Sequence, residues 1–118
     1  MKINYNCNCS RPNFKNKYAY WEDREVTSDE REIITYLKNN INLNNKNILH
    51  IGIGNSYLSK ELSKNNNIYG ITVSRKEIIS GNNLNLDNYK IFLCDKYSNN
   101  FMKFFENIKF DIIIDNNI

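Results

Sequence analysis

The stretch HIGIGNS, residues 50–56, decides the fold of this chain. It closes an apolar run and precedes Tyr57, Leu58 and Leu62, whose spacing predicts a helix. Gly52 and Gly54 let the backbone turn sharply and approach a ligand, and free amides at the helix start favour polar or anionic groups. A glycine turn between a strand and a helix of a parallel sheet is therefore a predicted ligand site. The alternative is a tight turn that binds nothing.

The rest of the chain repeats this strand-then-helix pattern. Four short apolar runs cover residues 48–53, 68–73, 89–94 and 110–114. They start about twenty residues apart, and each gap holds apolar residues at helical spacing, which favours parallel strands joined by right-handed crossovers. The expected fold is α/β, a Rossmann-like parallel sheet of about four strands with flanking helices. An antiparallel sheet fits less well because the gaps are too long for hairpins.

Upstream of the first run, two segments differ in character. Residues 1–26 have no clear period and contain the aromatic side chains of Tyr18, Tyr20 and Trp21, so we expect an irregular arm. From Thr27 onward, capping and acidic residues precede apolar residues at helical spacing, which predicts a helix over about residues 28–40. We therefore divide the chain into the arm, residues 1–26, and one domain, residues 27–118.

Composition excludes several classes of protein. The 118 residues suit one domain with a modest core. The sequence has no apolar run of about 18 residues and no apolar signal segment, which predicts a cytoplasmic, soluble protein without a membrane span. The net charge of +3 comes from interspersed charges, so a nucleic-acid surface is not indicated. Cys7, Cys9 and Cys94 with the one histidine do not make a metal site, and we assign no role to Cys7 and Cys9.

Polar side chains stand at the end of each later run. Thr72 and Ser74 end the second run, Asp95 follows the third, and Asp115 follows the fourth. Each aspartate alone is typical of a helix cap. Parallel strands, however, bring their carboxyl ends to one edge of the sheet, so these residues are expected to line one crevice with the two glycines. Carboxylates there can accept hydrogen bonds from ribose hydroxyls, an exocyclic amine or an ammonium group.

Taken together, four segments resemble the N-terminal half of a class I S-adenosylmethionine-dependent methyltransferase. NILHIGIGNS, residues 47–56, resembles the first motif of the family, and GITVS, residues 70–74, resembles the end of its second strand. Cys94-Asp95 is similar to the adenine-contact site, and FDIIID, residues 110–115, is similar to the fourth strand with its acidic end. The resemblance covers somewhat over half of the chain.

This resemblance implies a site for S-adenosylmethionine. It implies that Gly52 and Gly54 pack on the methionine moiety, that Thr72 faces the ribose, and that Asp95 reaches the adenine amine. Asp115 with the following residue would border the transferring methyl group. The implied cofactor-binding residues are His50, Gly52, Gly54, Asn55, Ser56, Thr72, Ser74, Asp95 and Asp115. No catalytic residue is identified.

The chain departs from the pattern of the family at three of these positions. His50 stands where the family has Asp or Glu, and Ser56 stands where it has the third glycine. Thr72 replaces the acidic residue that grips the ribose hydroxyls, although GITVS also resembles the Gly-x-Thr-x-Ser segment of the cyclopropane-fatty-acid-synthase branch. The arm containing Trp21 resembles the variable lid that covers cofactor and substrate in the family.

The resemblance also implies an incomplete sheet, because members of the family have seven strands. The fourth strand, residues 110–114, would then be an apolar edge, and we expect another copy of the chain or the N-terminal arm to cover it. The first functional hypothesis is methyl transfer to an unidentified acceptor. The alternatives are a non-catalytic cofactor-binding module or subunit that pairs with another chain, and a remnant or other nucleotide-binding protein.

Overall fold

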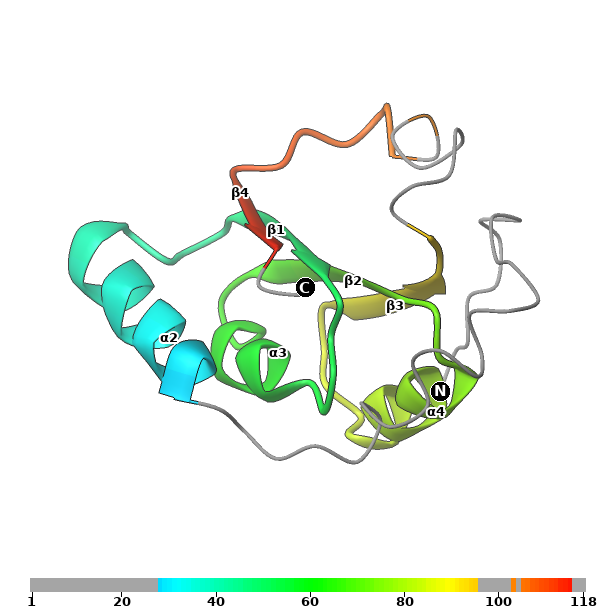
Figure 1. The fold of residues 1–118 in the computed structure, drawn as a ribbon. Helices are drawn as coiled ribbons and strands as arrows, with labels where there is room; N and C mark the ends of the chain where they lie inside the picture. Colours follow the sequence, from blue (N-terminus) through cyan, green and yellow to red (C-terminus); the bar gives the residue numbers. More distant parts are fainter. Residues whose placement is uncertain (1–27, 96–102, 104, 116–118) are drawn as a thin grey trace.

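The chain forms a four-stranded, fully parallel sheet with strand order β3-β2-β1-β4 (Figure 1). The computed structural model describes residues 28–95, 103 and 105–115. Its elements are α2 (Ser28–Asn40), β1 (Asn47–Ile51), α3 (Tyr57–Leu62), β2 (Asn67–Thr72), α4 (Arg75–Asn83), β3 (Tyr89–Leu93) and β4 (Ile112–Asp115). The sequence prediction of a Rossmann-like α/β sheet is confirmed, and so is the predicted helix over residues 28–40.

The strand order contains a switch point between β1 and β4. From β1 the chain moves outward to β2 and then to β3, whereas β4 returns to the other side of β1. Right-handed crossovers in these two opposite directions place their connections on opposite faces of the sheet. Helices α2, α3 and α4 accordingly lie on one side of the sheet, and residues 105–111, which lead into β4, lie on the other (Figure 1). Ligands of such sheets bind at the carboxyl ends of the strands beside the switch point.

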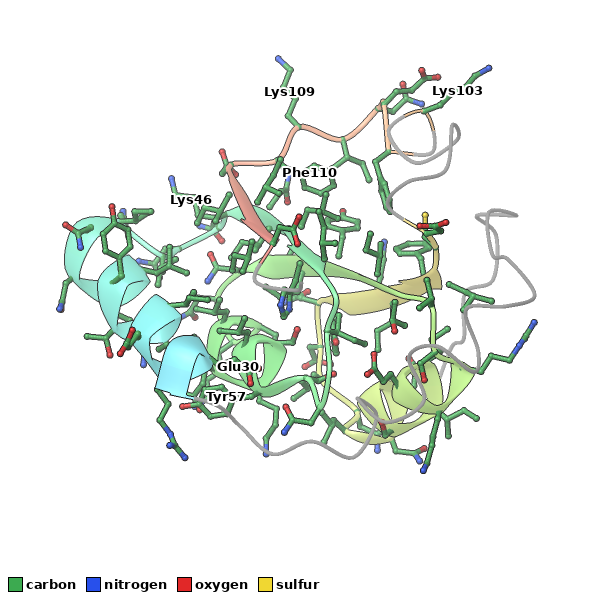
Figure 2. All side chains as sticks on the ribbon, viewed as in Figure 1. Glu30, Lys46, Tyr57, Lys103, Lys109 and Phe110 are labelled. Atoms are coloured by element: carbon green, nitrogen blue, oxygen red, sulfur yellow. The ribbon has the colours of Figure 1, made fainter. Side chains whose placement is uncertain are left out.

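The two faces bury different kinds of side chain. On the helical face, Ile48, Ile68 and Ile114 from three strands pack with apolar residues of α2 and α3. The opposite face packs Leu49, Ile51, Ile71 and Phe92 against Phe105, with Tyr69 and Phe110 at its margin. Figure 2 shows Phe110 on the side of the sheet away from Glu30 and Tyr57. This division follows from the alternation of side chains along each strand.

Aromatic edge-to-face contacts hold the second face. Phe105 contacts Phe92 with ring centroids 5.4 Å apart, and it contacts Phe110 at 5.8 Å. Phe110 in turn meets Tyr69 at 5.5 Å. Such pairs contribute about 0.5–1.5 kcal/mol beyond the burial of their area. The aromatic residues between β3 and β4 therefore do the packing that helices do on the other face.

Two predicted strand boundaries differ from the structure by two residues, and the others differ by at most one. The first strand ends at Ile51 rather than at residue 53, because the backbone turns at Gly52. The fourth begins at Ile112 rather than at residue 110, and Asp111 instead bonds to Asn47: its N–H donates to the Asn47 carbonyl, and its Oδ2 accepts from the Asn47 N–H, both at 2.8 Å. Asp115 is consequently the last residue of β4.

Some sequence predictions fall outside the described residues. They include the arm of residues 1–26 with Trp21, the roles of Cys7 and Cys9, and most of the apolar residues at helical spacing in the last gap, residues 101–105. Among the helices that the structure describes, none is long and apolar enough to cross a membrane.

Candidate functional site

The backbone of the glycine turn begins at the end of β1. The Gly52 N–H still donates to the Ile71 carbonyl of β2 at 2.9 Å, so the turn starts directly at the sheet. Gly52 and Gly54 have φ angles of 79° and 57°, in the left-handed region. A side chain at either position would strain this backbone, which explains why both residues are glycine.

Ser56 ends the turn and has the same left-handed conformation without being glycine. Its φ is 66°, and its side chain is buried. As the N-cap residue of α3 it makes no side-chain capping bond; its Oγ lies 2.7 Å from the hydroxyl of Tyr89 instead. The neighbouring Asn55 accepts a hydrogen bond from the Tyr57 N–H at 3.1 Å and so organises the helix start.

The other two glycines let the turn pack closely on the sheet and on α4. A Cβ atom at Gly70 of β2 would lie 2.6 Å from Cγ2 of Ile53, which is fully buried. A Cβ atom at Gly81 of α4 would collide with Ile91 and lie 3.1 Å from Ser56 Oγ. These two positions are thus glycine because neighbouring side chains occupy the space, and the result is a turn seated firmly on β2 and α4.

A buried hydrogen-bond network joins the end of β2 to α4. The Thr72 hydroxyl donates to Glu77 Oε1 at 2.5 Å and accepts from the Ser74 N–H at 3.1 Å. Ser74 Oγ caps α4 by accepting from the Glu77 N–H at 3.2 Å. Thr72 and Ser74 therefore lie at the predicted edge, and their hydroxyls organise the backbone there.

Glu77 is the residue that the sequence interpretation missed. It is buried and places a carboxylate beside Thr72, next to the end of β2. Glu77 thus brings a carboxylate from the first turn of α4 to the hydroxyl at the end of β2. The signal was present in the sequence, because Ser74 and Glu77 have the spacing of a helix capping box.

Asp95 follows β3 at the same edge. The Cys94 N–H donates to the Thr72 carbonyl at 2.8 Å, which extends the pairing of β3 with β2 up to this point. Asp95 is 1% exposed. Burial, aided by the negative charge of Asp95, raises the pKa of the Cys94 thiol to about 12, so the thiol is protonated at neutral pH. Cys94 therefore acts as a core residue.

His50 and Asp115 are placed by the pairing of β1 with β4. His50 is 1% exposed and stands between Gly70 of β2 and Ile114 of β4 in the register. Asp115 pairs with Ile51 and is exposed, so it borders the switch point from the other side. His50 is thus enclosed within the sheet layer, whereas Asp115 faces solvent at its edge.

The predicted site residues all lie at one edge, but they do not form one tight cluster. Asp95 follows β3 and Asp115 is the last residue of β4, and these two outermost strands have β2 and β1 between them. Three strand spacings separate the ends of these strands by about 14 Å. Only an elongated ligand lying across the carboxyl ends of the strands can contact both aspartates.

Two cavities in the described part of the chain can be placed relative to this edge. One of about 920 Å³ is lined by residues at the starts of β2 and β3 and at the end of α4, including Asn67, Asn82 and Tyr89, at the opposite end of the strands. The other, of about 440 Å³, lies between α2 and β4 and includes Asp115. Within the described part of the chain, no group of three or more His, Cys, Asp or Glu side chains is placed to hold a metal ion.

The sequence matches no protein-family model and no curated protein. Among solved structures, the chain is similar to coclaurine N-methyltransferase bound to N-methylheliamine and SAH, with 23% sequence identity and a TM-score of 0.46. The match covers 63% of this chain and 25% of that one.

Proposed function

We propose that this protein binds S-adenosylmethionine at the carboxyl edge of its sheet and belongs to a methyltransferase-type system whose methyl acceptor is not identified. The observation that carries the proposal is the left-handed glycine turn of Gly52 and Gly54, which lies next to the switch point between β1 and β4. In open parallel sheets, this is the place where ligands bind and where backbone amides are available to them.

The chemistry of the surrounding groups fits an elongated ligand with an adenosyl group at one end and an amino acid at the other. Glu77 and Asp95 offer carboxylate oxygens beside the ends of β2 and β3, where they would accept hydrogen bonds from ribose hydroxyls and an exocyclic amine. The glycine turn lies between this pair and Asp115 in the order of the strands. The proposed contacts therefore run from Asp95 through the turn to Asp115.

The cofactor would supply an electrophilic sulfonium methyl group, and the chain would act by holding its two ends. Because Cys94 is protonated at neutral pH and His50 is enclosed in the sheet, neither side chain is proposed as a base. Transfer would then depend on proximity and orientation of the acceptor. A non-catalytic cofactor-binding module is the alternative to an enzyme.

Isothermal calorimetry with S-adenosylmethionine and S-adenosylhomocysteine tests the proposal. We expect saturable heat with both compounds. Absence of heat at millimolar ligand would reject both the enzyme and the binding module. Formation of S-adenosylhomocysteine only when an acceptor is supplied would then separate the enzyme from the module.

A pair of aspartate variants tests the location of the site. Asp95→Ala should weaken binding by about 1–3 kcal/mol, because the adenine amine would lose its buried acceptor. The matched control is Asp87→Ala, since Asp87 is exposed and precedes β3 at the opposite end of the sheet. Equal affinities of the two variants would count against the carboxyl edge as the site.

We also propose that another chain or the N-terminal arm covers β4. The observation that supports this proposal is the exposure of Ile113 on the outer strand β4, where 56% of the residue is exposed. In an antiparallel pair of β4 strands centred on Ile113, Asp115 of one copy would face Asp111 of the other, which is unfavourable. Sedimentation at several protein concentrations tests self-association. If the protein is a strict monomer and its amides exchange fast along residues 112–115, the proposal that β4 is covered is wrong.

A further inference from the structure

We infer that Tyr89 is a positioning residue that holds the glycine turn in its ligand-binding shape by acting through Ser56. The inference rests on the proposed function, since it concerns the same site. Tyr89 is the first residue of β3 and is therefore far from the carboxyl edge along the strand. Its side chain nevertheless reaches the last residue of the turn, 33 positions earlier in the sequence.

The path of the Tyr89 side chain is defined by two glycines. A Cβ atom at Gly70 would lie 3.1 Å from Tyr89 Cε1, and one at Gly81 would lie 3.7 Å from Cε2. The ring therefore lies between β2 and α4, over positions where a larger residue would displace it. This packing leaves the hydroxyl at 2.7 Å from Ser56 Oγ.

Ser56 needs such a contact because of its backbone. A left-handed φ is less favourable than the right-handed region for any residue with a Cβ. Glycine at this position would avoid the cost, but the chain has serine. The hydrogen bond to Tyr89 offsets part of the cost of the left-handed backbone at Ser56. It also fixes the direction in which the turn leaves the sheet.

Two further observations agree with this role. Ser56 makes no side-chain capping bond, so its hydroxyl is available to Tyr89. The Ser56 carbonyl accepts from the Lys60 N–H at 3.0 Å, and the Ser56 N–H donates to the Ile53 carbonyl at 3.0 Å. A contact that fixes Ser56 therefore restrains both the glycine turn before it and the first turn of α3 after it.

The experiment combines Tyr89→Phe, Ser56→Gly and the double variant. Tyr89→Phe keeps the ring and removes the hydroxyl, and we expect a 3- to 10-fold higher Kd for S-adenosylhomocysteine by calorimetry. In the Ser56→Gly background, which needs no such bond, Tyr89→Phe should leave Kd unchanged. Tyr36→Phe is the matched control, because Tyr36 is 63% exposed on α2.

Amide hydrogen exchange of the free protein provides a readout that needs no ligand. Tyr89→Phe should speed exchange at residues 52–56 more than in the strands. Faster exchange spread evenly over the sheet would instead indicate general destabilisation and overturn the inference, as would unchanged exchange with unchanged Kd. If the wild-type protein does not bind S-adenosylhomocysteine, the proposed function fails, and the exchange pattern alone still decides the role of Tyr89.

Discussion

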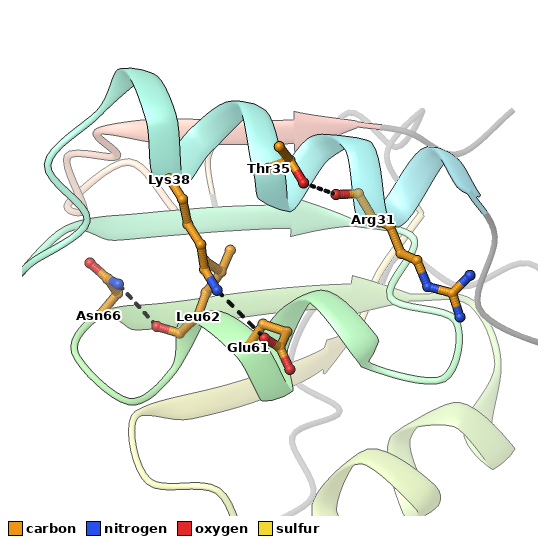
Figure 3. Close-up of polar contacts among 6 residues, drawn as sticks. All are labelled: Arg31, Thr35, Lys38, Glu61, Leu62 and Asn66. Carbon is orange, nitrogen blue, oxygen red and sulfur yellow. Dashed lines mark hydrogen bonds and ion pairs between the residues drawn. The ribbon is translucent and has the colours of Figure 1, made fainter.

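Two regions of the molecule differ in how exposed their polar contacts are: the glycine-turn side, formed by residues 52–56, the end of β2 and α4, and the α2–β4 side, formed by α2 and β4. On the glycine-turn side, Ser56, Thr72 and Glu77 are buried, and each is hydrogen-bonded to another side chain. On the α2–β4 side Glu30 is also buried, but the ion pair that joins α2 to α3 is exposed: Lys38 and Glu61 lie 3.7 Å apart (Figure 3). Of the large apolar side chains that the structure describes, the two most exposed, Tyr36 and Ile113, also belong to this side.

The difference shows where the chain tolerates change. A buried hydroxyl that loses its partner keeps the full cost of its desolvation, whereas an exposed one is solvated by water. Exposed ion pairs such as Lys38 with Glu61 contribute between about 0 and 1 kcal/mol. We therefore expect substitutions on the glycine-turn side to cost much more than matched substitutions on the α2–β4 side.

The largest effect is expected from Gly70→Val. The new Cβ would lie 2.6 Å from Cγ2 of the fully buried Ile53, so the turn or β2 must shift. We expect a loss of about 3 kcal/mol in the free energy of unfolding, measured by urea denaturation. An unchanged urea midpoint would show that Ile53 does not pack on Gly70.

The next effect compares one substitution in the two regions. Thr72→Val should cost about 2 kcal/mol, because the Ser74 N–H and the Glu77 carboxylate lose the hydroxyl that they share. Thr35→Val is the control, since the Thr35 hydroxyl donates to the Arg31 carbonyl on the exposed surface of α2 (Figure 3). It should cost less than about 0.5 kcal/mol. Equal costs would remove the contrast between the regions.

A third effect depends on pH. Burial raises the pKa of Tyr89 from 10.0 to about 12; the hydroxyls of Ser56 and Ser59 lower this pKa, and the charge of Glu77 raises it. Between pH 10 and 12 the unfolded state loses this proton first, so stability falls as pH rises. The contribution lost by pH 11 is about 1.4 kcal/mol.

Urea denaturation of wild type and Tyr89→Phe from pH 8.5 to 11 measures this loss. The raised pKa of Cys94 acts in the same direction, but Cys94 is present in both proteins and cancels in the difference. Parallel stability curves for the two proteins would contradict the burial of the Tyr89 hydroxyl.

The smallest effect is expected on the α2–β4 side. Ile113→Thr keeps a β-branched side chain at a position that is 56% exposed, so the free energy of unfolding should change by less than about 0.5 kcal/mol. A clearly larger loss that depends on protein concentration would indicate that another chain buries Ile113.

Much of the fold was predictable because its signals are local. The four apolar runs and the helix over residues 28–40 follow from periodicity, and the turn follows from Gly52 and Gly54. The location of Thr72, Ser74 and Asp95 at one edge follows from the parallel strands. Sequence reasoning did not identify Glu77 as a site residue, because its contact with Thr72 depends on how the chain turns from β2 into α4. The capping spacing of Ser74 and Glu77 was nevertheless visible in the sequence.

The sequence by itself determined the alternation of strands and helices and the position of the glycine turn, because both depend on residues close together in the chain. Only the tertiary structure decided that Tyr89 supports Ser56, since that contact depends on the packing of β3 beside β2 and on the space left at Gly70 and Gly81. It also decided that β4 pairs with β1, which separates Asp95 from Asp115 across the sheet. Strand order depends on contacts between residues far apart in the chain, whereas apolar periodicity reports only local secondary structure.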